Sequence, residues 1–122
     1  MNKNVFGEPL ITCSLNPLTG YFRNGCCDTD NTDVGMHTVC VIVSQKFLIF
    51  SKSVGNDLTT PIPQYGFEGL KEGDKWCLCA LRWKEALMNN VAPKVVLEAT
   101  NEGTLGIIKM EDLIKHSHKH LD

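Results

Sequence analysis

Two short segments of the chain are apolar on both of their alternating faces, and they constrain the fold more than any other feature. Residues 37–43 read HTVCVIV, and residues 75–81 read KWCLCAL. Strands that are buried on both faces have this continuous pattern, because neither side of the sheet meets water. We therefore predict central strands at residues 39–43 and 76–81 in a sheet that is covered on both faces, and we expect residues 95–99 to form a third central strand.

Helical patterns follow each of these strands. In residues 45–54, Phe47 and Phe50 fall on one helical face, and Ser44 is a suitable N-cap. Residues 82–90 carry a similar apolar stripe among good helix formers. The other expected elements are a strand at residues 94–100 with its core at 95–99, a short strand at residues 107–108 and a terminal helix at residues 111–118.

Two long segments, residues 13–36 and 55–74, lack any regular pattern and are rich in glycine, proline, asparagine and aspartate. Irregular segments of this length are uncommon in compact domains unless they are functional or anchored. The order of the elements predicts an α+β fold, with a small mixed β-sheet of three to four strands covered by two to three helices. A long irregular N-terminal arm and a central loop complete it. We expect residues 1–122 to form a single domain.

Charge and hydropathy exclude some kinds of partner. The chain has 12 Lys and Arg against 14 Asp and Glu, a net charge of −2, so we expect no nucleic-acid partner. It has no run of 18 apolar residues, so we expect no membrane partner. Residues 1–9 lack the apolar core of a signal peptide, which predicts a cytoplasmic location.

Six cysteines in 122 residues are many for a cytoplasmic domain. They are compatible with buried thiols that pack as small apolar groups, with a metal site, or with redox chemistry and disulfides. The predicted cytoplasmic location counts against disulfides, because cytoplasmic thiols are kept reduced. The cysteines are Cys13, Cys26, Cys27, Cys40, Cys77 and Cys79.

A zinc site is one interpretation of this set. Cys77 and Cys79 point to one face of their expected strand, and the pair Cys26 and Cys27 lies in the arm, which needs an anchor. These four are the expected zinc ligands. Buried thiols remain the alternative, because none of the spacings is that of a zinc knuckle. The reserve ligands are Cys13, His37 and Cys40.

Polar and aromatic residues beside the central loop predict a pocket for a small molecule. Loop residues on a rigid scaffold often carry function, and an arginine next to a tryptophan suits a planar anion. Capping of turns and filling of the core is the alternative role for the same side chains. The candidate ligand-binding residues are Asn56, Asp57, Asp74, Arg82 and Trp83.

The sequence favours a small binding domain, with a cysteine-anchored zinc or thiol-redox module and a small-molecule enzyme as alternatives. It contains no phosphate-binding loop, dinucleotide fingerprint or serine-hydrolase motif. His37 and Cys40 are three residues apart, so on one strand they face opposite sides and do not form a catalytic pair. The catalytic residues are therefore left unassigned.

Three longer strings carry a family resemblance: NGCC at residues 24–27, HTVC at residues 37–40, and GLKEGDKWCLCALRWKEA at residues 69–86. Together they resemble an uncharacterised, mainly bacterial family, domain of unknown function 2237. The resemblance covers nearly the whole chain and implies a one-domain protein. It implies no reaction, cofactor or catalytic residue.

Overall fold

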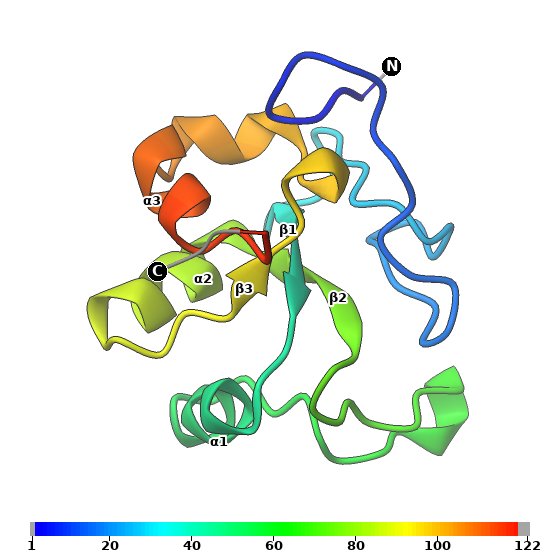
Figure 1. Cartoon of the computed structure of the whole chain (residues 1–122). Helices are drawn as coiled ribbons and strands as arrows, with labels where there is room; N and C mark the ends of the chain where they lie inside the picture. Colours follow the sequence, from blue (N-terminus) through cyan, green and yellow to red (C-terminus); the bar gives the residue numbers. More distant parts are fainter. Residues whose placement is uncertain (1, 120–122) are drawn as a thin grey trace.

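The computed structural model describes residues 2–119 and is built around a three-stranded antiparallel sheet (Figure 1). The strands are β1 (His37–Ile42), β2 (Lys75–Cys79) and β3 (Lys94–Val95). β1 lies in the centre, paired with β2 along its length and with β3 over two residues. The α+β class is confirmed. The prediction that residues 76–81 and 95–99 also form central strands is wrong, because β2 and β3 are the two edges and, within residues 2–119, only β1 has a strand on each side.

Three α-helices follow in chain order: α1 (Gln45–Ser53), α2 (Ala80–Met88) and α3 (Met110–Lys115). α1 begins where the sequence predicts, because the Ser44 hydroxyl accepts a hydrogen bond from the Phe47 amide at 3.1 Å. α2 begins two residues earlier than predicted and follows β2 without a linker. In residues 2–119, no helix is long and apolar enough to cross a bilayer. Short 3₁₀ helices occupy Pro63–Tyr65, Leu97–Ala99 and Glu102–Gly106.

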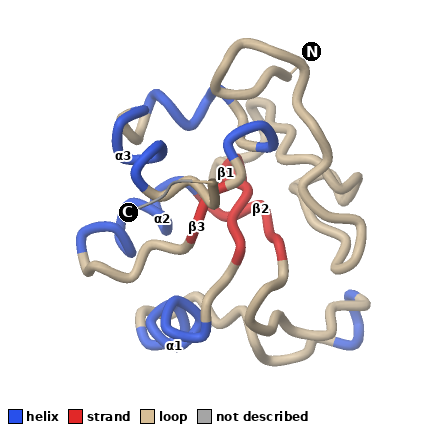
Figure 2. Tube along the Cα trace, viewed as in Figure 1, coloured by secondary structure: helices blue, strands red, loops and turns tan. Residues whose placement is uncertain are grey.

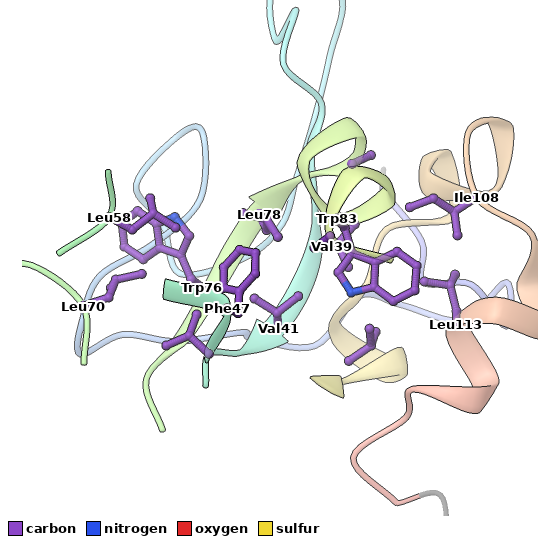
Figure 3. Close-up of a cluster of buried hydrophobic side chains, with 14 of the residues drawn as sticks. Val39, Val41, Phe47, Leu58, Leu70, Trp76, Leu78, Trp83, Ile108 and Leu113 are labelled. Carbon is purple, nitrogen blue, oxygen red and sulfur yellow. The ribbon is translucent and has the colours of Figure 1, made fainter. Parts of the chain in front are cut away.

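Buried side chains of α1 and α2 share one hydrophobic core with one face of β1 and β2, and Figure 3 shows Phe47 and Trp83 beside Val39, Val41 and Leu78. This face carries Val39, Val41 and Leu78, which contact Phe47 of α1 and Trp83 of α2. All five side chains are at most 1% exposed. Burial of each of the two rings stabilises the fold by roughly 2–3 kcal/mol. The prediction that Trp76, Leu78 and Ala80 are buried is confirmed.

The N-terminal arm, residues 13–36, packs on the opposite face. It contains no helix and no strand, and it lies on the side of the sheet away from α3 (Figure 2). Because side chains alternate along a strand, Cys40 and Cys77 point to this face, where disulfides join them to Cys13 and Cys27. Thr19 adds a polar contact, since its hydroxyl accepts a hydrogen bond from the Cys77 amide at 2.9 Å.

The third strand is shorter than predicted, because it ends at Val95 and not at Thr100. The Thr100 hydroxyl accepts a hydrogen bond from the Cys40 amide at 3.2 Å and donates one to the Val96 carbonyl at 2.8 Å. The Thr100 side chain therefore takes the place of a backbone hydrogen bond between strands, and Leu97–Ala99 forms a 3₁₀ helix.

The C-terminal part also differs from prediction. Ile107 and Ile108 form no strand, because both amides donate to the Thr104 carbonyl at the end of a 3₁₀ helix. α3 ends at Lys115, and Ser117 then forms an isolated parallel bridge with Val95. This bridge is the parallel component at the edge of an otherwise antiparallel sheet.

The central loop, residues 55–74, is folded back on itself. The Leu70 amide donates to the Leu58 carbonyl at 2.8 Å, and Ile62 pairs with Phe67 around a short 3₁₀ helix. Leu58 and Leu70 are buried in the helical core. The loop is thus anchored at its base, and its first residues reach the outer edge of β2.

Candidate functional site

A cavity of about 380 Å³ lies along the outer edge of β2. We name it the β2 cavity. Its walls come from the arm turn at residues 20–23, from Asn56 and Leu58 of the central loop, from β2 itself and from the first turns of α2. Three segments distant in sequence thus meet at one strand edge.

The arm turn has this shape because of Gly20. Its φ is +101°, a left-handed conformation that favours glycine, and a Cβ at this position would collide with the Cys26 carbonyl oxygen. The tight turn places Tyr21 and Arg23 beside the strand edge.

Two arginines, Arg23 and Arg82, bring positive charge to the lining of the β2 cavity, and no acidic side chain lines it among the residues that the structure describes. Arg82 is held in place by the Val54 carbonyl and the Glu85 carboxylate, each 3.2 Å from its Nη1. The Arg82 side chain is about one-third exposed, so it can still bind a ligand.

Two aromatic side chains form flat walls. The Tyr21 ring stacks on the His37 imidazole with 6.0 Å between centroids, and its hydroxyl donates to the Thr32 carbonyl at 3.0 Å. The Arg23 guanidinium carbon lies 5.2 Å from the centroid of the Trp76 ring, a cation–π contact. These contacts fix the arm side chains against the sheet.

His37 is oriented by a buried carboxylate. Its Nδ1 lies 2.7 Å from Oδ1 of Asp33, whose side chain is fully buried. The other oxygen, Oδ2, accepts hydrogen bonds from the His37 amide at 2.9 Å and from the Thr29 hydroxyl at 3.0 Å. The imidazole is itself 41% exposed, so one of its nitrogens faces protein while the ring stays accessible.

Cys79 faces His37 across the β1–β2 pair. The two residues are Cα partners, because an irregularity between His37 and Val39 shifts the register there. Cys79 is partly exposed, forms no disulfide, and is the residue from which α2 begins. Both side chains line the β2 cavity.

The predicted ligand-binding residues are placed in different surroundings. Asn56 and Arg82 line the β2 cavity. Asp74 lines a second, more polar hollow between the arm and the central loop, where its carboxylate accepts from the Lys71 amide. Trp83 lies in the core, and its Nε1 donates to the Pro93 carbonyl at 3.1 Å.

Asp57 is an exposed cap of its own loop. Its carboxylate accepts hydrogen bonds from the side chain of Thr60 and from the amides of Thr59 and Thr60. These hydrogen bonds hold the pKa of Asp57 well below its usual value. The bond from the Thr60 hydroxyl has the largest effect, and the bond from the Thr59 amide has the next largest. Asp57 therefore stabilises the turn that follows Asn56, which lines the β2 cavity.

The cysteines are in three different environments. Of the states that the sequence leaves open, four of the six cysteines have the disulfide state, as Cys13–Cys40 and Cys27–Cys77. The sulfur atoms of Cys13, Cys27 and Cys77 lie within 4.8 Å of one another, so the two bridges are neighbours. Of the four predicted zinc ligands, Cys27 and Cys77 are in this cluster. The Cys26 sulfur lies 3.9 Å from the Thr12 hydroxyl, and Cys79 lines the β2 cavity.

The sequence matches the model of domain of unknown function 2237, described as an uncharacterized protein conserved in bacteria, over residues 3–117. The chain belongs to this family. The resemblance drawn from the tryptophan–cysteine string is confirmed, and the description of domain of unknown function 2237 names no activity. Among curated proteins there is no match to the chain.

Sequence reasoning did not find the group formed by Asp33, His37 and Cys79. It tested His37 against Cys40 on the same strand and rejected that pair, whereas the facing cysteine is on β2. The register irregularity in β1 that opposes His37 to Cys79 has no signal in residue pattern. Arg23 and Tyr21 were also missed, because the path of an arm without regular structure is set by its disulfides.

Proposed function

We propose that the chain binds a small organic anion in the β2 cavity. The observation that carries this proposal is the lining charge. Arg23 and Arg82 line the cavity and no carboxylate does among the described residues, although Glu85 pairs with Arg82 from outside the lining, and the net charge of the chain is −2. A cationic cavity in an acidic protein attracts and retains anionic ligands.

The shape and the walls of the cavity favour an organic ligand over a bare inorganic ion. A volume of about 380 Å³ is within the range of small-molecule sites, roughly 300–1,000 Å³. Tyr21 and Trp76 contribute aromatic edges to the lining, and the Asn56 amide offers both a donor and an acceptor. A planar body with one carboxylate or phosphate group suits these walls.

A pair of probes that differ only in charge tests the proposal. Benzoate and benzamide share a ring, and inorganic phosphate supplies charge without a ring. With the full chain, we expect benzoate to give saturable shifts of the Asn56 and Cys79 amide resonances in NMR titrations, and benzamide to bind at least about tenfold more weakly. Equal binding of benzoate and benzamide would contradict an anion site, as would no response to either benzoate or phosphate.

Matched variants locate the charge effect. Arg82→Gln removes one positive charge from the cavity, and Lys46→Gln removes one from the exposed face of α1. We expect the first to weaken benzoate binding about tenfold, since a charge-assisted hydrogen bond is lost, and the second to leave it nearly unchanged. Thermal unfolding of both variants checks that each is folded. If both variants weaken benzoate binding equally, the effect comes from the net charge of the chain and not from a site at Arg82.

A second candidate function follows from the cysteine cluster. Opening both bridges frees the thiols of Cys13, Cys27, Cys40 and Cys77, three of which already lie within 4.8 Å of one another. Cys40 and Cys77 are partners across β1 and β2. Four thiolates in this arrangement suit tetrahedral zinc, whose binding free energy would replace the two cross-links. Elemental analysis of the reduced chain after addition of zinc and gel filtration tests this: one zinc per chain supports it, and none overturns it.

The location of the chain bears on which of these states is used. The cytoplasmic location inferred from residues 1–9 stays a proposal. In a compartment that keeps thiols reduced, the four bridge cysteines would be free to bind metal. In an oxidising compartment they would stay bridged, and the β2 cavity would be the functional feature. The anion site requires neither metal nor redox chemistry.

A further inference from the structure

One wall of the β2 cavity carries an imidazole and a thiol, and a buried carboxylate outside the cavity lining holds the imidazole. The first contact is between Asp33 and His37. Because Nδ1 of His37 donates to the buried Asp33 carboxylate at 2.7 Å, the neutral ring carries its lone pair on Nε2. A ring fixed in this way can take a proton from a neighbouring group.

The second relation is between His37 and Cys79, which are Cα partners across β1 and β2 at the register irregularity. Partners across an antiparallel pair place their side chains on the same face of the sheet. Both residues line the β2 cavity, and one face of the His37 ring stacks on Tyr21. Among the described residues no hydrogen bond joins the Cys79 thiol to the imidazole, and catalytic hydrogen bonds of this kind often tighten only when substrate is bound.

Disulfide chemistry does not account for Cys79. It forms no disulfide, and exchange with the Cys27–Cys77 bridge is disfavoured by geometry. Side chains two residues apart on a strand are separated by roughly 6–7 Å, whereas Cβ atoms in a disulfide are about 3.8 Å apart. The cavity side chain of Cys79 is therefore not a resolving thiol for that bridge.

The start of α2 adds donors next to Cys79. The Ala80 amide is taken by the Met36 carbonyl, and no side chain caps the helix. The following amides of the first turn, at Leu81 and Arg82, are among the donors that a helix leaves without an intrahelical acceptor. Donors of this kind stabilise an oxyanion that forms beside the thiol.

We propose that Cys79 is a nucleophile with His37 as its general base, and that this site transfers the acyl group of a small anionic thioester or ester to water. Asp33 is a positioning residue that orients His37. The inference rests on the anion-binding function proposed for the β2 cavity, which would hold the acid group of the substrate at Arg82 or Arg23. Cys79 and His37 supply a thiol and a base on the cavity wall, and Asp33 orients the base from the interior.

The reaction balances in two steps. First, the Cys79 proton passes to Nε2 of His37, the sulfur bonds to the carbonyl carbon, and the thiol or alcohol leaves with the proton from His37. Then water gives a proton to His37 and attacks the acyl carbon. The carbon–sulfur bond breaks, the free acid leaves, and the proton returns to Cys79. No oxidant, reductant or metal is consumed.

Alkylation of the folded, non-reduced chain tests the nucleophile. Iodoacetamide forms a carbon–sulfur bond and releases iodide, and peptide mass spectrometry measures Cys79 and Cys26 in the same sample. Cys26 is a matched internal control, because it is also unbridged and partly exposed but lies outside the cavity lining. We expect Cys79 to react at least about tenfold faster than Cys26. Equal rates would overturn the proposal.

Variants of the base and its orienting group separate mechanism from packing. His37→Gln keeps the backbone amide that bonds Asp33, and we expect it to slow Cys79 alkylation by about tenfold or more without slowing Cys26. Asp33→Asn should have a smaller effect in the same direction. In His37→Ala, added imidazole should restore part of the rate, which a merely structural role would not allow. Unchanged Cys79 rates in His37→Gln would overturn the assignment of the base.

Two thioesters test the acyl step and keep the two proposals distinguishable. The probes are the succinyl and butyryl thioesters of N-acetylcysteamine, which have the same chain length and differ by a carboxylate in place of a methyl group. We expect release of free N-acetylcysteamine, a transient acyl mass on Cys79, a preference for the succinyl thioester, and loss of turnover in Cys79→Ser. If Cys79 is hyper-reactive but the Arg82→Gln variant keeps the same preference, the anion site fails and the nucleophile stands. If benzoate binds but neither thioester acylates Cys79, the acyl-transfer proposal fails alone.

Discussion

The two faces of the β1–β2 pair are closed in different ways. On one face, Val39, Val41 and Leu78 pack against α1 and α2, and burial of apolar side chains closes the sheet. On the other face, Cys40 and Cys77 are joined by disulfides to an arm that has no helix or strand. The first face depends on many small contacts, whereas the second depends on a few covalent ones.

This difference shows where a small domain can place a binding site. A helix packed on a sheet leaves little space, because interiors are close-packed. An arm that is fixed at a few points can leave a hollow between them, and the β2 cavity lies where the arm turn, the central loop and the edge of β2 meet. The face that is closed by disulfides thus provides the cavity. The face that is closed by helices keeps β2 rigid, and Cys79 is the last residue of this strand.

Loss of both disulfides should be the largest single effect on stability. Loop closure predicts about 3.5 kcal/mol for the bridge that spans 27 residues and about 4 kcal/mol for the one that spans 50. We expect urea unfolding with and without a phosphine reductant to show a loss of several kcal/mol. The paired variant Cys27→Ala with Cys77→Ala should show the larger share of this loss.

The control for the bridges is Cys26→Ser, which removes a partly exposed thiol from the same arm. Its stability should depend on the reductant as the parent chain does. If the reductant leaves the urea midpoint of the parent chain unchanged, the arm is not held by its cross-links, and the contrast between the two faces disappears.

The helical face is probed by Trp83, which is fully buried and meets the ring of His116 edge-on at 5.4 Å. Trp83→Ala leaves a large cavity in α2 and should cost about 3–5 kcal/mol in the free energy of unfolding. Trp83→Phe keeps most of the packing but leaves the Pro93 carbonyl without its donor, for a smaller loss of about 1–3 kcal/mol.

Chemical unfolding of both variants, with the disulfides intact, provides the measurement. The loss should be the same in oxidised and reduced chains, because Trp83 lies on the face that the arm does not cover. A loss in Trp83→Ala that vanishes on reduction would show that the two faces are strongly coupled.

The same contrast explains how much could be predicted from the sequence. The strands at residues 39–43 and 76–81 and the helix after Ser44 were predictable, because their apolar spacing matches the period of each element. The end of the third strand was not, because the Thr100 hydroxyl replaces a backbone ladder bond. Such a substitution depends on where Cys40 lies in space.

The candidate site was predictable only in part. Asn56 and Arg82 follow elements with clear patterns, and both line the β2 cavity. Asp33, Tyr21 and Arg23 lie in the arm, whose path follows from cysteine pairing, and six cysteines allow fifteen connectivities. Residue spacing cannot choose among these, nor can it reveal the register that opposes His37 to Cys79.

A single hydroxyl gives the smallest and sharpest test of the contrast. Thr19 is fully buried, and its Oγ1 accepts a hydrogen bond from the Cys77 amide at the outer edge of β2. Thr19→Val keeps the shape but leaves that amide without an acceptor, which should cost about 1–3 kcal/mol. Thr19→Ser keeps the hydroxyl and should cost less.

Hydrogen exchange at the Cys77 amide measures the effect locally, and it should quicken in Thr19→Val while the amides of α2 stay protected. If the α2 amides lose protection to the same degree, the arm and the helices unfold as one unit. If only Cys77 responds, the arm can separate from the edge of β2 while the helical face stays closed, and ligands then have a route into the β2 cavity.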